Sequence, residues 1–214
     1  MKVAIAGGHG KIAMRLTRLL RQRGDEVRSL IRDPGQSDDV REVGAEPVVC
    51  DLEAASEAQV GEAVGPVDAV VFAAGAGPGS GPERKWTLDC GGAVKLIAAA
   101  TAGGIDRYLM ISSMGADPAA PGDDTFSVYR QAKGKADAEL QASGLDYTIV
   151  RPTRLTDEPG TGLVELGEGL GRGTVSRDDV AAVLAAALDS PRTARRLFEV
   201  KGGDVPIADA IAAL

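Results

Sequence analysis

The sequence predicts an α/β fold: a doubly wound parallel sheet with helices on both faces and a very small lobe at its C-terminal, substrate side. Short apolar runs alternate with longer amphipathic stretches along the chain. Most of the apolar runs are continuous rather than alternating, which is typical of parallel strands buried on both faces. We expect all 214 residues to form one domain, with residues from about 151–175 and 200–214 making up the lobe.

The order of the expected elements follows from these runs. The strands are expected at Lys2–Ala6, Glu26–Ile31, Glu46–Val49, Ala69–Ala73, Arg107–Ile111, Tyr147–Val150 and Leu197–Val200. The helices are expected at Lys11–Arg23, Ser37–Val43, Ser56–Val64, Glu83–Thr101, Thr125–Ala142, Arg177–Leu188 and Ile207–Ala213. Two segments without a clear period, Gly75–Glu83 and Thr153–Gly173, follow predicted strands at the edge where ligands bind in open α/β sheets.

Composition excludes several classes of function. Lysine and arginine number 24 and aspartate and glutamate 31, so the formal charge of −7 argues against a nucleic-acid binder. No apolar run reaches about 18 residues, so we expect no membrane span. The opening MKVAIAGGHG lacks the pattern of a secretory signal, so we expect a cytoplasmic protein. Cys50 and Cys90, with one histidine, cannot form a disulfide framework or a Cys/His zinc site, so we expect no metal.

A glycine-rich turn joins the first strand to the first helix. In VAIAGGHGKIA, Gly7, Gly10 and Ala13 form a G-x-x-G-x-x-A pattern. Small residues there let the backbone approach a pyrophosphate, and the helix N-terminus supplies N–H donors. Because the pattern follows a predicted strand and opens a predicted helix, it predicts dinucleotide binding. His9 lies inside this turn, and we interpret it as a turn residue near the phosphates rather than a catalyst.

The end of the second strand indicates the form of the dinucleotide. An acidic residue at this position would bind the ribose diol of NAD, whereas arginine suits the 2′-phosphate of NADP. Arg32 comes first, and Asp33 follows it before Pro34. A guanidinium pairs with phosphate in a bidentate manner, so we expect NADP, with NAD as the less favoured cofactor. The alternative is that Arg32 is solvated and Asp33 binds the diol.

The segment YRQAK contains the candidate acid/base. Tyr129 and Lys133 are an i, i+4 pair on a predicted helix and therefore share one face. A phenol is a poor base at neutral pH, but a nearby ammonium favours its ionised form, so the pair predicts acid/base chemistry. The alternative is that Tyr129 only packs at the edge of the helix. Ser112 and Ser113 end the preceding strand, and either hydroxyl is a candidate donor to a substrate carbonyl or a simple turn serine.

Several segments together resemble the short-chain dehydrogenase/reductase superfamily. They are GGHGKIA, IRDP, CDLE, FAAGAG, DCGGAVKLIAAA, YLMISSMGA, YRQAK and IVRPT, which span nearly the whole chain. The resemblance is strongest to the atypical NAD(P)H-binding members related to the extended NAD-dependent epimerase/dehydratases. It implies a Rossmann-like fold and a nicotinamide cofactor.

The resemblance also implies cofactor contacts. The pyrophosphate would be held by Gly7, Gly10 and Ala13, with loop contacts from His9, Lys11 and Ile12. The 2′-phosphate would be taken by Arg32, and the adenine would be bordered by Asp51 and Leu52. The ribose and pyrophosphate would lie along Ala73, Ala74 and Gly75, and the nicotinamide end would contact Pro152 and Thr153.

The implied catalytic set is Tyr129 as acid/base, Lys133, which also binds the nicotinamide ribose, Ser113 and Asp89. Ser113 matches the family's hydroxyl position because Met114 and Gly115 follow it. Asp89 departs from the pattern, since related extended enzymes carry asparagine there. An atypical subgroup with aspartate at this position often lacks a convincing catalytic set.

The leading hypothesis is an NADP-dependent oxidoreductase acting on a small carbonyl, flavin or quinone-like substrate. The lobe is too small for an obvious nucleotide-sugar site. Two alternatives stay open: a non-catalytic NADP(H)-binding sensor, and a sugar epimerase or dehydratase that recycles its cofactor. Arg151, Arg154 and Arg172 are either attractors of an anionic substrate or surface charges. The chain is expected to act as a monomer or homodimer.

Overall fold

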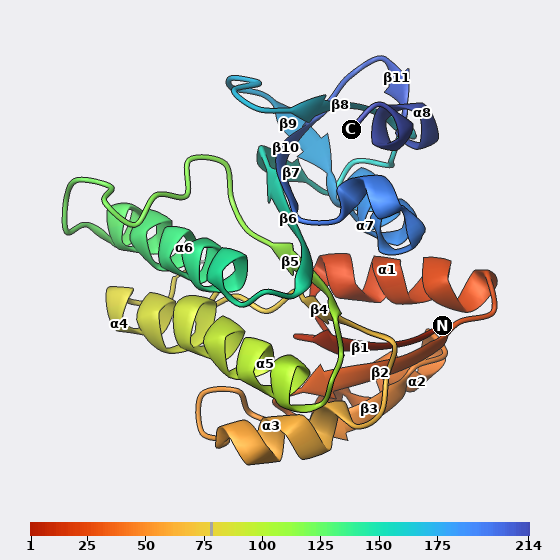
Figure 1. Cartoon of the computed structure of the whole chain (residues 1–214), viewed down its shortest axis with the longest axis vertical. Helices are drawn as coiled ribbons and strands as arrows, with labels where there is room; N and C mark the ends of the chain where they lie inside the picture. The colour runs from red at the N-terminus through yellow and green to blue at the C-terminus, as the bar shows by residue number, and fades with distance from the viewer. Residues whose placement is uncertain (78) are drawn as a thin grey trace.

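In the computed structural model, which describes residues 1–77 and 79–214, a nine-stranded sheet carries helices on both faces (Figure 1). Its strand order is β11-β8-β10-β6-β5-β4-β1-β2-β3, and β7 and β9 form a separate parallel pair. The strands are β1 Lys2–Ala6, β2 Glu26–Ile31, β3 Glu46–Val49, β4 Ala69–Phe72, β5 Arg107–Ile111, β6 Asp146–Pro152, β7 Arg154–Thr156, β8 Leu163–Gly167, β9 Thr174–Ser176, β10 Arg196–Gly202 and β11 Val205–Pro206. The predicted fold class is confirmed.

Apart from the expected helix Glu83–Thr101, the helices occupy the predicted positions with small shifts at their ends. They are α1 Lys11–Gln22, α2 Ser37–Glu42, α3 Glu57–Val64, α4 Pro82–Arg84, α5 Gly91–Ala102, α6 Thr125–Ala142, α7 Arg177–Asp189 and α8 Ile207–Ala212, with a π-helical segment η2 at Lys85–Cys90. Residue Pro78, in the predicted loop Gly75–Glu83, lies outside the described residues. In the part of the chain that is described, helices are too short or too polar to span a bilayer.

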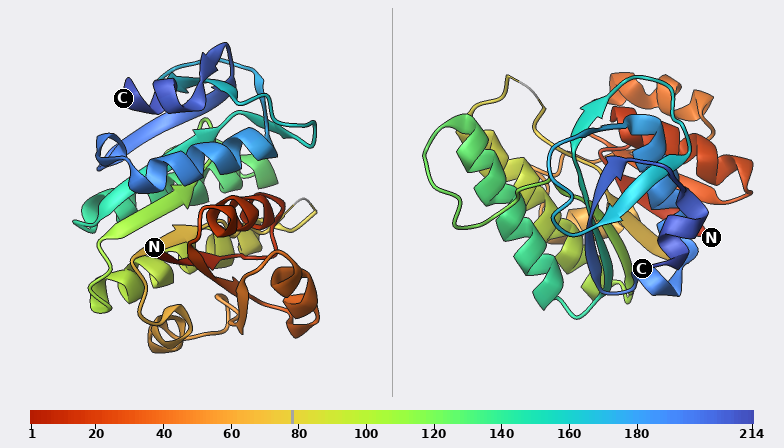
Figure 2. Two further views of the ribbon diagram at one scale, coloured as in Figure 1. Left: turned by 90° about the vertical axis from the view of Figure 1, so that its right-hand side faces the viewer. Right: turned by 90° about the horizontal axis from the view of Figure 1, so that it is seen from above.

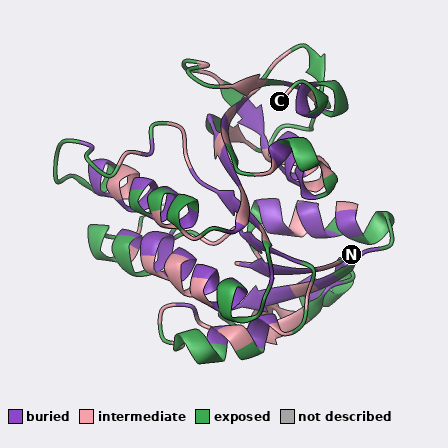
Figure 3. Ribbon diagram, in the orientation of Figure 1, coloured by how far each residue is buried: buried purple, intermediate pink, exposed green. Residues whose placement is uncertain are grey.

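The central strands are buried on both faces, as their continuous apolar runs predicted (Figure 3). Successive side chains of a strand point to opposite faces. Accordingly, Val3 and Ile5 of β1 belong to the core cluster that includes side chains of α1, α7 and α8, whereas Ala4 and Ala6 belong to the cluster that includes side chains of α3, α5 and α6. Figure 2 shows the two layers from other directions, with α1 and α7 side by side on one face.

The direction of winding changes between β1 and β4. From β1 the chain moves outward through β2 to β3, all parallel, and then returns to place β4 on the other side of β1. The loops after β1 and β4 therefore diverge to opposite sides and leave a crevice between them. In open α/β sheets this switch point is where ligands bind.

The structure corrects two expectations, one about a segment expected to be irregular and one about a segment expected to be a single helix. Thr153–Gly173, expected to be irregular, contains β7 and β8, and β8 pairs antiparallel with β10 and β11. These strands are short and separated by glycines, so no run was long enough to show a period. The expected helix Glu83–Thr101 is divided into α4, η2 and α5. A single π-helical turn of this kind often lies at a functional site.

Candidate cofactor and substrate site

Two adjoining cavities open at the switch point of the sheet. One, of about 300 Å³, extends from the glycine turn toward the ends of β2 and β3. The other, of about 800 Å³, extends from the same turn toward η2 and α6. Gly10, Ala73, Ala74 and Gly75 line both cavities, so the two form one groove that passes over the turn.

Glycine is required at two positions of this turn. Gly7 has φ +77°, and a Cβ there would lie 2.6 Å from the Ala74 Cα. At Gly8 a Cβ would lie 2.4 Å from the Ser29 Cβ. Both residues donate their N–H groups to the Leu30 carbonyl, at 3.1 and 2.9 Å. The turn is therefore held tightly between β2 and the loop after β4.

The first turn of α1 faces the groove with its donors available. Gly10 begins the helix, and among the described residues no side chain caps it. Uncapped N–H groups and the positive end of the helix dipole form an anion-binding site, which fits a pyrophosphate. Ile12 lines the larger cavity, whereas Ala13 is fully buried, consistent with close helix packing. The His9 ring pairs with Asp39 at 2.8 Å, and the Lys11 ammonium pairs with Asp157 at 2.6 Å.

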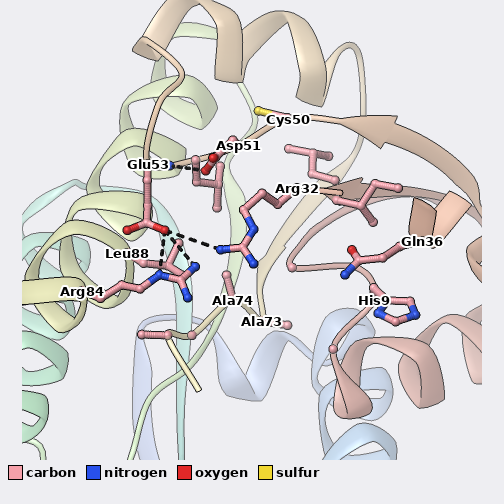
Figure 4. A pocket seen from close by; sticks show the side chains of 17 residues that line it. His9, Arg32, Gln36, Cys50, Asp51, Glu53, Ala73, Ala74, Arg84 and Leu88 are labelled. Carbon is pink, nitrogen blue, oxygen red and sulfur yellow. Dashed lines mark hydrogen bonds and ion pairs between the residues drawn. The ribbon is translucent and has the colours of Figure 1, made fainter. Parts of the chain in front are cut away.

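Two arginines meet one carboxylate in the smaller cavity (Figure 4). Arg84 donates to the Glu53 carboxylate at 2.9 Å, and Thr87 donates to its other oxygen at 2.6 Å. Arg32 lies 4.0 Å from the same carboxylate, and its side chain is 55% exposed. Most of the guanidinium of Arg32 is therefore free to bind a ligand. Asp51 and Leu52 line the same cavity.

The Glu53 carboxyl is held in its charged form. Burial acts to raise its pKa, but hydrogen bonds from Thr87 and Arg84, and the charges of Arg84 and Arg32, outweigh this and lower the pKa. One carboxylate then faces two guanidinium groups, so the cluster keeps a net positive charge. Asp33 is not part of this cluster of Glu53, Arg84 and Arg32. Its carboxylate accepts the Gly35 N–H at 2.8 Å and caps the following turn.

The larger cavity brings together three of the four predicted catalytic residues. Tyr129, Lys133 and Asp89 all line it. The Lys133 ammonium is buried, lies 3.5 Å from an Asp89 carboxylate oxygen and donates to the Ile111 carbonyl at 3.1 Å. The other Asp89 oxygen accepts the Ala76 N–H at 3.1 Å. Asp89 thus fixes both the lysine and the loop that follows β4.

Of the two serines that follow β5, Ser112 lines this cavity rather than the expected Ser113. Ser112 donates to the buried Asp137 carboxylate at 2.8 Å, and Arg151 holds the same oxygen at 2.7 and 2.9 Å. Burial raises the pKa of Asp137, while the Arg151 charge and these hydrogen bonds oppose the rise. Since the Ser112 hydrogen is committed to Asp137, this hydroxyl could serve a ligand only as an acceptor. The Ser113 hydroxyl instead contacts the Met114 carbonyl at 3.3 Å.

Some expected contacts lie beside the groove, and some lining residues were not expected. Pro152 and Thr153 are buried at the end of β6, outside the described lining of both cavities. The Thr153 N–H donates to the Val200 carbonyl of β10. The lining residues that the sequence did not indicate include the polar side chains of Gln36, Glu53, Arg84 and Lys85. Lys85 stands four positions before Asp89, and that spacing was the one signal in the sequence that could have linked it to the site.

Comparison with known proteins agrees with the geometry of the groove. A family model described as "NAD(P)H-binding" matches residues 7–191. The chain is 40% identical to a protein of Bacillus subtilis named an uncharacterized sugar epimerase, over 99% of each chain. It is 26% identical to an NAD(P)H azoreductase of Xenophilus azovorans, covering 94% of this chain and 68% of the azoreductase.

A solved structure shows the same fold over the full length. It is described as a putative NAD-dependent epimerase/dehydratase from Bacillus halodurans, with 39% identity, a TM-score of 0.93 and 100% of each chain covered. The resemblance to the atypical short-chain dehydrogenase/reductases is thereby confirmed. The chain belongs to the NAD(P)H-binding family of Rossmann-fold oxidoreductases and epimerases.

Proposed function

We propose that the chain is an NADP-dependent oxidoreductase that acts on a small carbonyl, flavin or quinone-like compound, with Tyr129 as the acid/base. One observation carries the proposal. Tyr129, Lys133 and Asp89 line a cavity that continues directly into the uncapped glycine turn. A phenol, an ammonium and a dinucleotide site in one groove are the parts that a carbonyl reduction needs.

The residues of the groove fit NADP along its length. The pyrophosphate would lie on the first turn of α1, and the 2′-phosphate would take the free donors of Arg32 beside Arg84. Asp51 and Leu52 would border the adenine. Lys133 would reach the nicotinamide ribose from its place against Asp89. When bound, the nicotinamide supplies or accepts the hydride.

The side chains of this protein donate the proton of the reaction and stabilise the base that remains. As a carbonyl carbon gains hydride, its oxygen gains negative charge, and the Tyr129 phenol donates a proton to give the alcohol. The Lys133 ammonium stabilises the phenolate that remains, and Asp89 keeps that ammonium in place. Ser112, as an acceptor, orients a hydroxyl or amide of the substrate rather than its reacting carbonyl oxygen.

Two matched tyrosine variants test this role. Tyr129→Phe and Tyr147→Phe each remove only a phenol oxygen, and Tyr147 lies near the start of β6, packed against the buried core and outside the described lining of both cavities. We expect Tyr129→Phe to lower turnover of NADPH with a panel of carbonyl acceptors about 100-fold or more. The Kd for NADPH should stay within about twofold by fluorescence titration. Full turnover in Tyr129→Phe would remove Tyr129 from the mechanism.

The names of two relatives favour a second candidate, an epimerase or dehydratase. The proteins from Bacillus subtilis and Bacillus halodurans both carry such names at about 40% identity. An enzyme of that class regenerates its cofactor in each cycle and shows no net oxidation of NADPH. Cofactor that copurifies at full occupancy, with no NADPH consumption across the acceptor panel, would select this candidate over the oxidoreductase.

A further inference from the structure

We propose that Lys85 is the anion-recognition residue of the larger cavity, and that the substrate carries a carboxylate on an apolar or aromatic body. The inference rests on the proposed function in one respect: it takes this cavity to be the substrate site. The observation behind it is a buried ammonium in that cavity that has no ion-paired carboxylate among the residues that the structure describes.

The charges that line the cavity do not balance. Lys11 and Arg177 both pair with Asp157, at 2.6 and 2.9 Å, and Lys133 pairs with Asp89. Within residues 1–77 and 79–214, Lys85 is the remaining cation of the lining, and no carboxylate lies within ion-pair distance of it. Its neighbours therefore leave its charge uncompensated.

Lys85 is also largely removed from water. The residue is only 7% exposed, and its ammonium donates to two neutral oxygens, the Gly77 carbonyl at 2.9 Å and the Ser80 hydroxyl at 2.8 Å. An ammonium has three donors, so one is left for a ligand. A buried charge without a partner is costly, and an anionic ligand would remove that cost.

The surroundings of Lys85 indicate what the anion is attached to. Its ammonium lies 5.5 Å from the centroid of the Tyr129 ring, which in turn lies 6.3 Å from the Phe126 ring. Phe126 is 63% exposed and lines the cavity together with Leu155 and Ile111. A carboxylate on Lys85 would thus hold an apolar or planar body against this wall, beside the Tyr129 phenol.

The other cations that the sequence offered for binding an anionic substrate are either ion-paired or outside the described lining of the groove. Arg151 is bound to Asp137, and Arg154 and Arg172 are exposed outside the described lining of the groove. Lys85 also holds the loop after β4 through Gly77 and Ser80, so a purely structural role would give the same contacts. The test must therefore read out charge recognition rather than stability alone.

Two pairs of probes differ only in the negative charge. They are 4-carboxybenzaldehyde with its methyl ester, and 4-oxopentanoate with its methyl ester. Each is titrated by calorimetry into protein saturated with NADP⁺, so that binding is read independently of turnover. The variants are Lys85→Met, Lys85→Arg and the matched control Lys135→Met, whose exposed lysine pairs with Glu139 on α6. NADPH affinity and melting temperature are measured for each.

We expect the wild type and Lys135→Met to bind at least one carboxylate about tenfold or more tightly than its ester. Lys85→Met should bind acid and ester equally, with the Kd for NADPH unchanged, and Lys85→Arg should restore part of the preference. The inference is overturned if the wild type binds neither carboxylate, or binds acid and ester equally well. It is also overturned if Lys85→Met keeps the preference for the acid, or if this variant loses affinity for NADPH instead.

These titrations, together with turnover assays of the same probes with NADPH, separate this inference from the proposed function. A preference that depends on Lys85, without reduction of any carbonyl probe, supports the anion site and contradicts the oxidoreductase. Reduction of acid and ester with equal KM supports the oxidoreductase and contradicts the anion site. The comparison of acid with ester in the wild type needs no variant, so it stands even where Lys85→Met fails to fold.

Discussion

At the scale of single residues, the site depends on which of two neighbours faces the groove. Ser112 and Ser113 are adjacent at the end of β5, yet only Ser112 reaches the described cavity, because Asp137 on α6 holds its hydroxyl. The motif indicated that a serine belongs here, but Asp137 lies 25 positions away and carries no local signal of the contact. The choice between neighbours is made by tertiary packing and could not be read from the sequence.

The proposed preference for NADP rests on Arg32 and leads to a prediction at this scale. Arg32→Gln should raise the Kd for NADPH about tenfold or more, because a charge-assisted contact to the 2′-phosphate is lost. The Kd for NADH should change by less than about twofold. Asp33→Asn is the matched control, since Asp33 only caps its own turn. Weaker NADH binding in Asp33→Asn would instead assign Asp33 to the ribose diol.

At the scale of elements, the lobe is organised by the start of α7. Ser176, followed by Asp178 and Asp179, is a residue pattern typical of a helix start, and it caps this helix; the two carboxylates also bind the preceding loop. Asp178 accepts the Gly160 N–H at 3.1 Å, and Asp179 accepts the Gly162 N–H at 2.8 Å. The sequence therefore indicated where α7 begins. It did not indicate that the same carboxylates also anchor the loop between β7 and β8.

Asp157, just after β7, joins this lobe to α1 and α7, and its titration gives a second prediction. The Lys11 hydrogen bond, opposed by burial and aided by the Arg177 charge, lowers the pKa of Asp157 below its usual value of 3.8. A carboxyl with a lowered pKa stabilises the fold above pH 3.8 and loses that contribution as the pH falls through its lower folded value.

The melting temperature of Asp157→Asn should accordingly lie below that of the wild type at pH 7. The difference should close as the pH falls below 3.8 and the wild-type carboxyl gains its proton. Asp123→Asn, at an exposed loop position, serves as the control and should match the wild type throughout. A difference that stays constant from pH 7 to pH 2 would show that the ion pairs of Asp157 contribute nothing.

At the scale of the whole molecule, the sequence predicted the parallel core but not its edge. Runs such as Ala69–Phe72 are apolar at every position because both faces are covered, and that pattern identifies parallel strands directly. The antiparallel strands β8 and β11 have no comparable signature. Val205 and Pro206 of β11 are both exposed, and β8 is half-buried, so β8 takes its place by pairing with β10 and β11, which lie far from it in the sequence.

The groove crosses the point where the two halves of the sheet meet, which leads to the last prediction. The cofactor would touch loops after β1, β2, β3 and β4, while its nicotinamide end would reach η2 and α6 from the other half. If the 214 residues unfold as one unit, binding to the native state raises the stability of all of them together. At 100 times Kd, NADPH should add about 2.7 kcal/mol, or about 5 to 10 °C in melting temperature.

Differential scanning calorimetry with and without NADPH tests this coupling. A single transition should move as a whole, and in Arg32→Gln the shift at the same NADPH concentration should shrink while the shift with NADH is kept. Two transitions, of which only one responds to NADPH, would mean that the lobe around β8, β10 and α8 unfolds separately. The ligand would then stabilise only the half of the sheet that carries the glycine turn, and the chain would not be one cooperative domain.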